Sequence, residues 1–164
     1  MRYTEMQSPI GRLVLAADDT GLRHIRFVDG RPSELPEPEW TRDDTALAEP
    51  QRQIEAYFGG ELRDFELKLA PAGTDFQCRV WWALADIPYA ETVSYATVAK
   101  RIERPSASRA VGAANGQNPL PIVLPCHRVI GANGSLTGYG GGLHIKEALL
   151  ALERRHGGQA PLFE

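Results

Sequence analysis

An apolar stretch bounded by prolines, residues 120–130, places a cysteine and a histidine next to each other. Pro125 has no N–H group and holds Leu124 in extended backbone, so the chain that enters Cys126 is stiff. The aliphatic residues on both sides favour burial, which predicts an apolar pocket around the thiol. A thiol becomes a nucleophile when a base takes its proton, and His127 is a base beside it. Two interpretations of Cys126 stay open, because most free cysteines are small buried side chains of the core.

The composition is typical of a globular protein. The 164 residues are 43% hydrophobic and 24% charged, which suits one or two domains. We expect a cytoplasmic protein with no membrane partner, since no apolar run has the length of a membrane span and the N-terminal residues lack a signal-peptide pattern. Cys78 and Cys126 are the only cysteines, and the four histidines are scattered. We therefore expect no disulfide framework, no metal and no cofactor.

Charge is distributed unevenly along the chain. Residues 1–75 carry 9 Lys and Arg against 15 Asp and Glu, whereas residues 76–164 carry 9 against 6. Between residues 93 and 130, five basic residues face a single acid: Lys100, Arg101, Arg104, Arg109 and Arg128 against Glu103. This pattern favours a polyanion as the partner of the second half, although an ordinary solvated basic face has the same composition.

The first half predicts a small sheet and a helix. Three short apolar runs, 2–7, 11–17 and 22–28, are separated by turn residues and predict a β-meander. A helix is expected from about Thr45 or Pro50 to the Gly59-Gly60 pair. Apolar residues then alternate with charged ones in the manner of a half-buried strand: Phe65, Leu67 and Leu69. We expect a linker at 71–73.

The second half predicts short helices. Thr74 or Asp75 caps the first, Ser94 caps a second and Ser106 caps a third over 107–115. The last two fit a helix-turn-helix, and small residues on the third would let a nucleic-acid backbone come close: Ala110, Gly112, Ala113 and Ala114. A helical hairpin packed through alanines is the alternative. A glycine-rich loop around Tyr139 and a helix over 143–153 complete the chain.

These pieces together resemble the O6-alkylguanine-DNA alkyltransferase family in its bacterial form. The family's active-site signature is Pro125-Cys126-His127-Arg128-Val129, and other family motifs stand around it in order: Ser94-Tyr95, Arg109 to Gly112, Asn118-Pro119, Tyr139 with the glycines after it, and Lys146 to Leu150. One departure is Ala90, where bacterial relatives usually have glycine.

The resemblance implies an α+β fold with two domains. The first, residues 1–73, would be a supporting domain with a small antiparallel sheet and a helix, similar to ribonuclease H. The second, residues 74–164, would be mostly helical, with a winged helix-turn-helix-like motif that binds DNA and carries the active site.

The resemblance also implies direct repair of DNA, in which the alkyl group of O6-alkylguanine, or of O4-alkylthymine, moves irreversibly to Cys126. His127 would accept the thiol proton through a water and Glu153 would orient His127. Tyr95 would donate to the guanine, and Asn118 would brace the turn before Cys126. Since neighbouring residues on a strand point to opposite faces, we expect no direct hydrogen bond between Cys126 and His127. The thioether is stable, so each molecule acts once.

The partner implied by the resemblance is double-stranded DNA, bound in the minor groove without regard to sequence. The damaged nucleotide would be flipped out and replaced by Arg109. The DNA-binding residues would be Arg109, Tyr95, Ser94, Ala110, Gly112 and Ala113. Val129, Tyr139, Gly140 and Gly141 would form the substrate pocket. We expect a monomer in solution, and cooperative binding along DNA is left open.

Two other functions compete with alkyl transfer. The chain could be a non-catalytic DNA-damage sensor or transcription factor, but a dimeric reader needs base-reading side chains on its recognition helix. It could also be a thiol hydrolase that uses Cys126 and His127, although no oxyanion-hole segment is evident and the basic second half would be unexplained.

Overall fold

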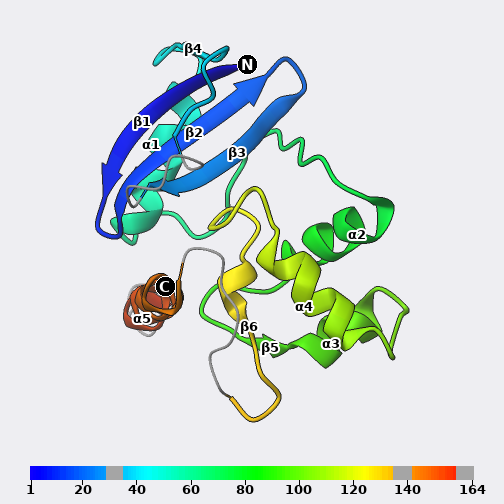
Figure 1. Cartoon of the computed structure of the whole chain (residues 1–164). Helices are drawn as coiled ribbons and strands as arrows, with labels where there is room; N and C mark the ends of the chain where they lie inside the picture. Colours follow the sequence, from blue (N-terminus) through cyan, green and yellow to red (C-terminus); the bar gives the residue numbers. More distant parts are fainter. Residues whose placement is uncertain (29–34, 135–141, 158–164) are drawn as a thin grey trace. The chain divides into compact units, whose positions relative to one another are not determined.

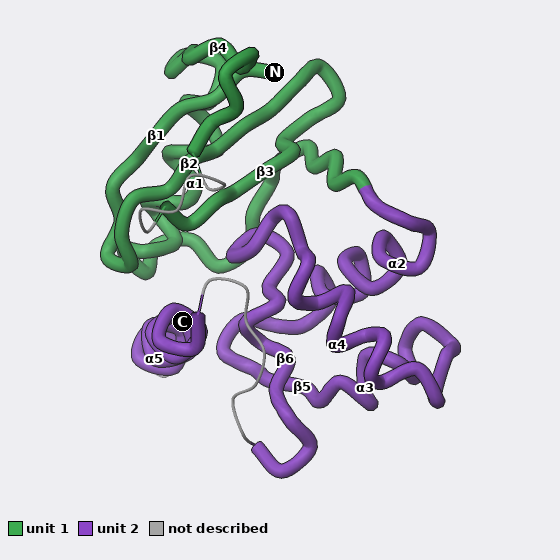
Figure 2. The backbone as a smooth tube through the Cα atoms, viewed as in Figure 1, with its two compact units in different colours: residues 1–72 green, residues 73–164 purple. Residues whose placement is uncertain are grey.

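The computed structural model describes residues 1–28, 35–134 and 142–157 (Figure 1). The chain divides into two compact units, residues 1–72 and 73–164 (Figure 2). The division falls one residue before the boundary expected from the Pro-Gly linker. Within the described residues, no helix is both long and apolar enough to span a membrane.

The first unit is built on a four-stranded sheet. Strands β1 (Arg2–Ser8), β2 (Gly11–Asp18) and β3 (Gly21–Val28) form the predicted antiparallel meander. The turn into β3 needs glycine, because Gly21 adopts a φ of 138°. A fourth strand, β4 (Thr41–Arg42), pairs in parallel with β1, giving the order β3-β2-β1-β4. The predicted antiparallel sheet is thus extended at one edge by a two-residue parallel strand.

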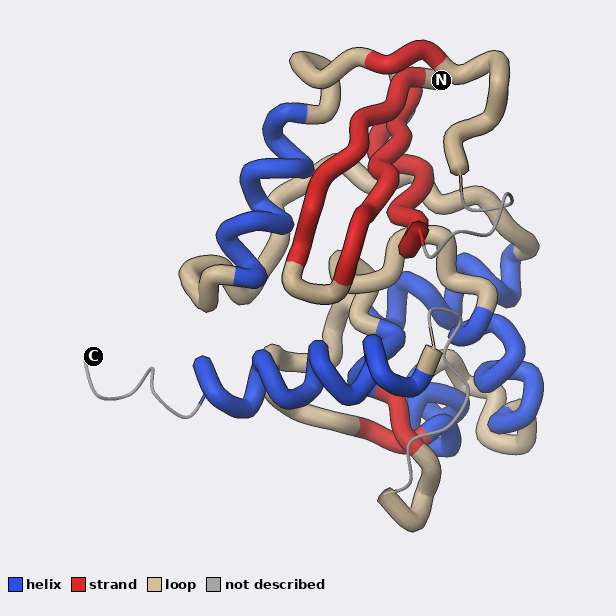
Figure 3. The backbone as a smooth tube through the Cα atoms, turned by 60° about the vertical axis from the view of Figure 1, so that its left-hand side comes forward, coloured by secondary structure: helices blue, strands red, loops and turns tan. Residues whose placement is uncertain are grey.

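Both faces of the central strand β2 are buried. On one face, Val14 and Ala16 pack with Trp40. Leu13 and Leu15 point to the opposite face and are fully buried. Helix α1 (Ala48–Phe58) packs against the sheet through a buried apolar side and ends before Gly59 (Figure 3).

The strand predicted over residues 65–69 is wrong. Half-buried and exposed residues do alternate there as the pattern requires, but only one bridge forms, between Leu22 and Leu69. Lys68 accepts from the Leu22 N–H and Leu22 accepts from the Ala70 N–H, both at 2.9 Å. The segment meets the sheet only at the start of β3, so no ladder is built.

The second unit is mainly helical. Its elements are α2 (Asp75–Leu84), β5 (Val93–Ser94), α3 (Tyr95–Arg101), α4 (Ser108–Gly116), a 3-10 helix (Cys126–Arg128), β6 (Val129–Ile130) and α5 (Leu143–Gly157). Strands β5 and β6 pair in parallel, and helices α2, α3 and α4 pack together. The indole N–H of the buried Trp81 donates to the Ala114 carbonyl at 2.8 Å, which ties α2 to α4.

Helix caps follow the predictions in two cases of three. Thr74 caps α2 and forms a capping box with Gln77. Ser94 caps α3 by accepting from the Thr97 N–H. Ser106 does not cap α4: a turn from Arg104 to Ala107 carries the chain one residue further, the helix starts at Ser108, and no side chain caps it. The first N–H groups of α4 therefore have no capping side chain.

Candidate active site

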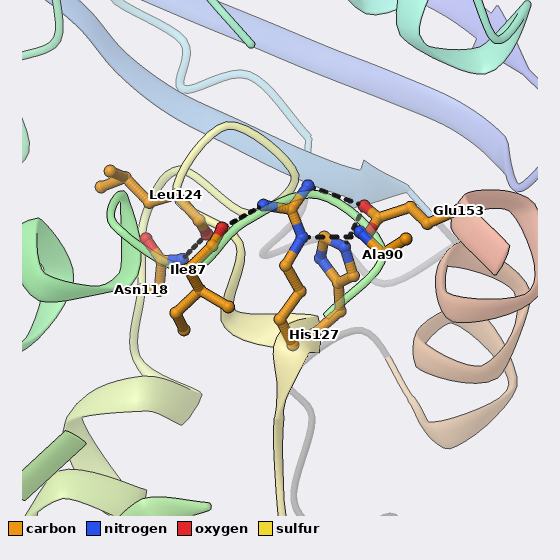
Figure 4. A network of polar contacts seen from close by, with 7 residues as sticks. Ile87, Ala90, Asn118, Leu124, His127 and Glu153 are labelled. Atoms are coloured by element: carbon orange, nitrogen blue, oxygen red, sulfur yellow. Dashed lines mark hydrogen bonds and ion pairs between the residues drawn. The ribbon is translucent and has the colours of Figure 1, made fainter. Parts of the chain in front are cut away.

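The segment that leads to Cys126 is a series of tight turns held by one asparagine. The Asn118 amide donates to the Leu124 carbonyl at 2.7 Å, and its oxygen accepts from the Leu120 N–H at 2.9 Å. Figure 4 shows Asn118 reaching Leu124. Between these anchors Ile122 has a φ of 75°, a strained conformation for a β-branched residue. Asn118 thus spans the whole turn between α4 and the cysteine.

The strand expected through Cys126 and His127 is wrong. Residues 126–128 form one turn of 3-10 helix, in which the Arg128 N–H donates to the Pro125 carbonyl at 3.0 Å. Pro125 adopts ψ 69° rather than an extended value, and pairing with β5 begins only at Val129. Cys126 and His127 therefore do not alternate between the two faces of a strand.

Cys126 is a buried cysteine, with 4% of its surface exposed. Its carbonyl accepts a hydrogen bond from the Asn115 amide at 3.2 Å. Asn115 lies on α4 and is itself buried. The backbone of the cysteine is therefore attached directly to the second helix of the helix-turn-helix.

His127 and Glu153 form a buried pair (Figure 4). The His127 Nε2 lies 2.6 Å from Glu153 Oε2, and both side chains are fully buried. A carboxylate accepts the Nε2 proton, which leaves the lone pair of a neutral imidazole on Nδ1. Among residues 1–28, 35–134 and 142–157, no group hydrogen-bonds to Nδ1. Nδ1 is thus the nitrogen that can take a proton.

Burial and neighbouring charges act in opposite directions on this pair. Burial lowers the pKa of His127, and the charges of Arg128 and Lys146 lower it further, while Glu153 raises it; the net direction is downward. Burial would raise the pKa of Glu153, but hydrogen bonds from His127 and Arg128 outweigh it and hold that pKa well below its usual range. Both directions favour a neutral imidazole beside an ionised carboxylate.

Lys146 is a second buried cation near the cysteine. Its ammonium donates to the Val129 carbonyl at 2.6 Å and lies 6.0 Å from the centre of the Tyr95 ring. Burial lowers the pKa of Lys146, and the charge of Cys126 raises it. Val129 is fully buried, so its side chain belongs to the core of this unit and its carbonyl is already in use.

The exposed side of α4 carries most of the predicted DNA-binding residues. Arg109, Ala110 and Ala113 are exposed, and Gly112 lies opposite the Tyr95 ring, where an added Cβ would come within 3.8 Å. Ala114 was expected, with the other small residues of this helix, to let a nucleic-acid backbone come close, but it is buried and its carbonyl accepts from Trp81. It therefore cannot belong to the surface expected to approach nucleic acid.

Three pocket residues, Tyr139, Gly140 and Gly141, lie outside the described residues. Within the residues that the structure does describe, no group of three or more His, Cys, Asp or Glu side chains is arranged to hold a metal ion.

Both parts of the chain match the models of one known protein family. Residues 75–155 match the model of the 6-O-methylguanine DNA methyltransferase DNA binding domain, and residues 1–71 match that of the ribonuclease-like domain of the same proteins. The chain belongs to the 6-O-methylguanine DNA methyltransferase family. The family suggested by the motifs around Cys126 is thereby confirmed.

Individual members of this methyltransferase family align over nearly the whole chain. A methylated-DNA–protein-cysteine methyltransferase of Methanosarcina acetivorans is 54% identical over 93% of this chain and 98% of its own length. One of Mycolicibacterium paratuberculosis is 53% identical over 95% and 94%. The crystal structure of Mycobacterium tuberculosis OGT in complex with DNA covers 95% of this chain and 94% of its own, with a TM-score of 0.88 and 49% identity. The predicted fold class is also confirmed.

Three buried polar residues of the site had no role in the sequence prediction: Asn115, Arg128 and Lys146. Arg128 stands inside the signature motif, and an arginine between a histidine and an apolar pair needs a buried acceptor. Lys146 is seven residues before Glu153, two turns along α5 and on the same face. That spacing could have indicated the lysine. No local pattern marks Asn115.

Proposed function

We propose that this methyltransferase family member repairs DNA by moving the alkyl group of O6-alkylguanine, and of O4-alkylthymine, to the sulfur of Cys126. The observation that carries the proposal is a buried cysteine next to a buried His127–Glu153 pair at 2.6 Å. A thiol in that position has a neutral base beside it and no bulk water around it.

The reaction balances without a cofactor. His127 Nδ1 takes the Cys126 proton through a water molecule, and the thiolate attacks the alkyl carbon. A carbon–sulfur bond forms while the carbon–O6 bond breaks, and its electron pair goes to the guanine. Tyr95 donates a hydrogen bond to guanine N3, which stabilises the departing base. The thioether is not reversed, so the protein is consumed with each repair.

Because the alkyl carbon is inaccessible inside a duplex, the damaged nucleotide must leave the helix. We assign α4 to the minor groove, where its small exposed residues permit close approach, and Arg109 to the space left by the flipped base. Ser94 and the uncapped start of α4 would meet the phosphates. Tyr139, Gly140 and Gly141 would bound the guanine, and the buried Val129 would support this pocket from the core. We further propose that the protein acts as a monomer in the cytoplasm, where its free cysteines stay reduced.

Replacing Arg109 by alanine tests the flipping role. We expect transfer from duplex DNA containing O6-methylguanine to slow by about tenfold to a hundredfold, equivalent to about 1.4 to 2.7 kcal/mol. Transfer from free O6-benzylguanine needs no flipping and should change less than about twofold. The measurement is the single-turnover rate on each substrate.

The matched control is Arg52→Ala, an exposed arginine on α1, which should leave both rates unchanged. Equal losses on duplex DNA and on the free base in Arg109→Ala would contradict the flipping role.

A further inference from the structure

Arg128 is a buried arginine whose donors are directed at groups of its own unit. Its side chain is 6% exposed. Nε and Nη2 donate to the two oxygens of Glu153 at 2.9 and 3.0 Å, and Nη1 donates to the Ile87 carbonyl at 2.7 Å. The guanidinium carbon lies 5.6 Å from the centre of the Tyr89 ring. This bidentate geometry is the strongest form of an arginine–carboxylate pair.

The carboxylate of Glu153 is fully occupied by donors. Oε1 accepts from Arg128 Nε and from the Ala90 N–H at 3.2 Å, and Oε2 accepts from Arg128 Nη2 and from His127 (Figure 4). Two acceptor sites on each oxygen give four, and these donors alone, all from described residues, supply four hydrogen bonds. Ala90 reaches the carboxylate from a backbone with φ 65°, the left-handed conformation that favours glycine. Glu153 therefore cannot rotate without breaking several bonds.

The negative charge of Glu153 is balanced by Arg128 and does not require a positive charge on His127. A buried carboxylate with His127 as its only charged partner would draw a proton onto the imidazole, and the resulting cation has no lone pair. Arg128 already supplies the positive charge that Glu153 needs. Among the described residues, the charged and titratable groups around His127 are Glu153 and Lys146 from α5, and Arg128 and Cys126 from its own 3-10 turn. Arg128 and Lys146 are cations, and their charges disfavour a further positive charge on His127.

We propose that Arg128 is a positioning residue for alkyl transfer, which clamps Glu153 and offsets its charge so that His127 stays neutral, with Nδ1 free to accept the Cys126 proton. The proposal rests on the proposed function for its kinetic consequence. Glu153 then orients the imidazole by its geometry, without protonating it.

The test compares the pH dependence of single-turnover transfer from free O6-benzylguanine in three variants. Arg128→Met removes the charge at similar length. Because a lost positive charge raises the His127 pKa, the low-pH limb of the profile should move upward by about one pH unit or more. Arg128→Lys keeps the charge but loses the bidentate contact with Glu153. The rate should therefore fall by about tenfold, while the low-pH limb of the profile stays at the same pH. Arg154→Met, an exposed arginine one residue after Glu153, is the control and should match the wild type.

A purely structural role for Arg128 predicts a different result, in which the rate falls by the same factor at every pH. That result, or an unchanged Arg128→Met profile, would overturn the proposal. The ionisation is also measured directly by nitrogen NMR of labelled histidine. In the wild-type protein at pH 7 we expect the His127 ring neutral, with its proton on Nε2.

The NMR measurement stands even where Arg128→Met does not fold, because a doubly protonated His127 ring in the wild type at pH 7 would overturn the proposal by itself. It also separates a failure of the proposed function from a failure of the role proposed for Arg128. A wild-type protein that transfers no alkyl group contradicts the proposed function, while a doubly protonated His127 ring contradicts the role proposed for Arg128.

Discussion

Alkyl transfer is expected to disappear when Cys126 is replaced by serine and to persist when Cys78 is. The serine hydroxyl is far harder to ionise than a thiol, and a neutral imidazole such as His127 cannot prepare it for attack on a saturated carbon. The measurement is the single-turnover transfer of a labelled methyl group from duplex DNA to protein. We expect a loss of at least about a thousandfold, equivalent to about 4 kcal/mol in the barrier.

Cys78 is the matched control, since it is the only other cysteine and lies on α2. Cys78→Ser should transfer one methyl group per molecule, as the wild type does. Binding of the damaged duplex should survive in Cys126→Ser, because the exposed side of α4 is unchanged. Transfer that continues in Cys126→Ser and stops in Cys78→Ser would contradict the proposal, because the acceptor would then be Cys78 on α2.

Replacing Glu153 by glutamine is expected to destabilise the protein and to slow transfer severely. The carboxylate oxygens of Glu153 accept hydrogen bonds from Arg128, His127 and Ala90, whereas the glutamine NH2 group would point two donors at these donors. The buried Arg128 would also lose the negative charge that neutralises it. Breaking one side of a buried ion pair costs about 3–5 kcal/mol. Urea denaturation at pH 7 measures this loss. Transfer should fall by about a hundredfold or more, because His127 is no longer held.

The stability difference between the wild type and Glu153→Gln should depend on pH. The pKa of Glu153 is lowered in the folded protein from its ordinary value of 4.5. A lowered pKa means that the stabilisation is complete above that ordinary value and fades as the pH falls below it. A double variant, Glu153→Gln with Arg128→Met, should recover part of the stability and none of the transfer. A stability loss below about 1 kcal/mol in the single variant would contradict a buried, charge-bearing Glu153.

Much of the fold could be predicted because its signals are local. The turns after β1 and β2, the Thr74 capping box and the Ser94 cap each depend on residues within four positions of one another. Predictions failed where distant partners decide. Residues 65–69 have the alternation of a strand but meet only Leu22, and Cys126 to Arg128 turn because Pro125 cannot donate and strand pairing starts at Val129.

The site was predictable only in part for the same reason. Cys126 and His127 are adjacent in the signature, so their proximity could be predicted from the sequence. The approach of Glu153 from α5 was implied by family resemblance alone. Arg128 and Asn115 gain their importance from contacts across 25 and 11 positions. Such contacts are set by the packing of α4 and α5 around the 3-10 turn, and a pattern in the chain cannot indicate them.

The central claim, that Cys126 is a single-use alkyl acceptor, is tested most directly by peptide mass mapping. The protein is incubated with an excess of duplex DNA containing O6-methylguanine, digested, and searched for added methyl groups. We predict one methyl group on the peptide with Cys126, at one equivalent per protein, and an unmodified Cys78 peptide. An unmodified Cys126 in protein that still binds the damaged duplex would contradict the account and would favour a damage sensor.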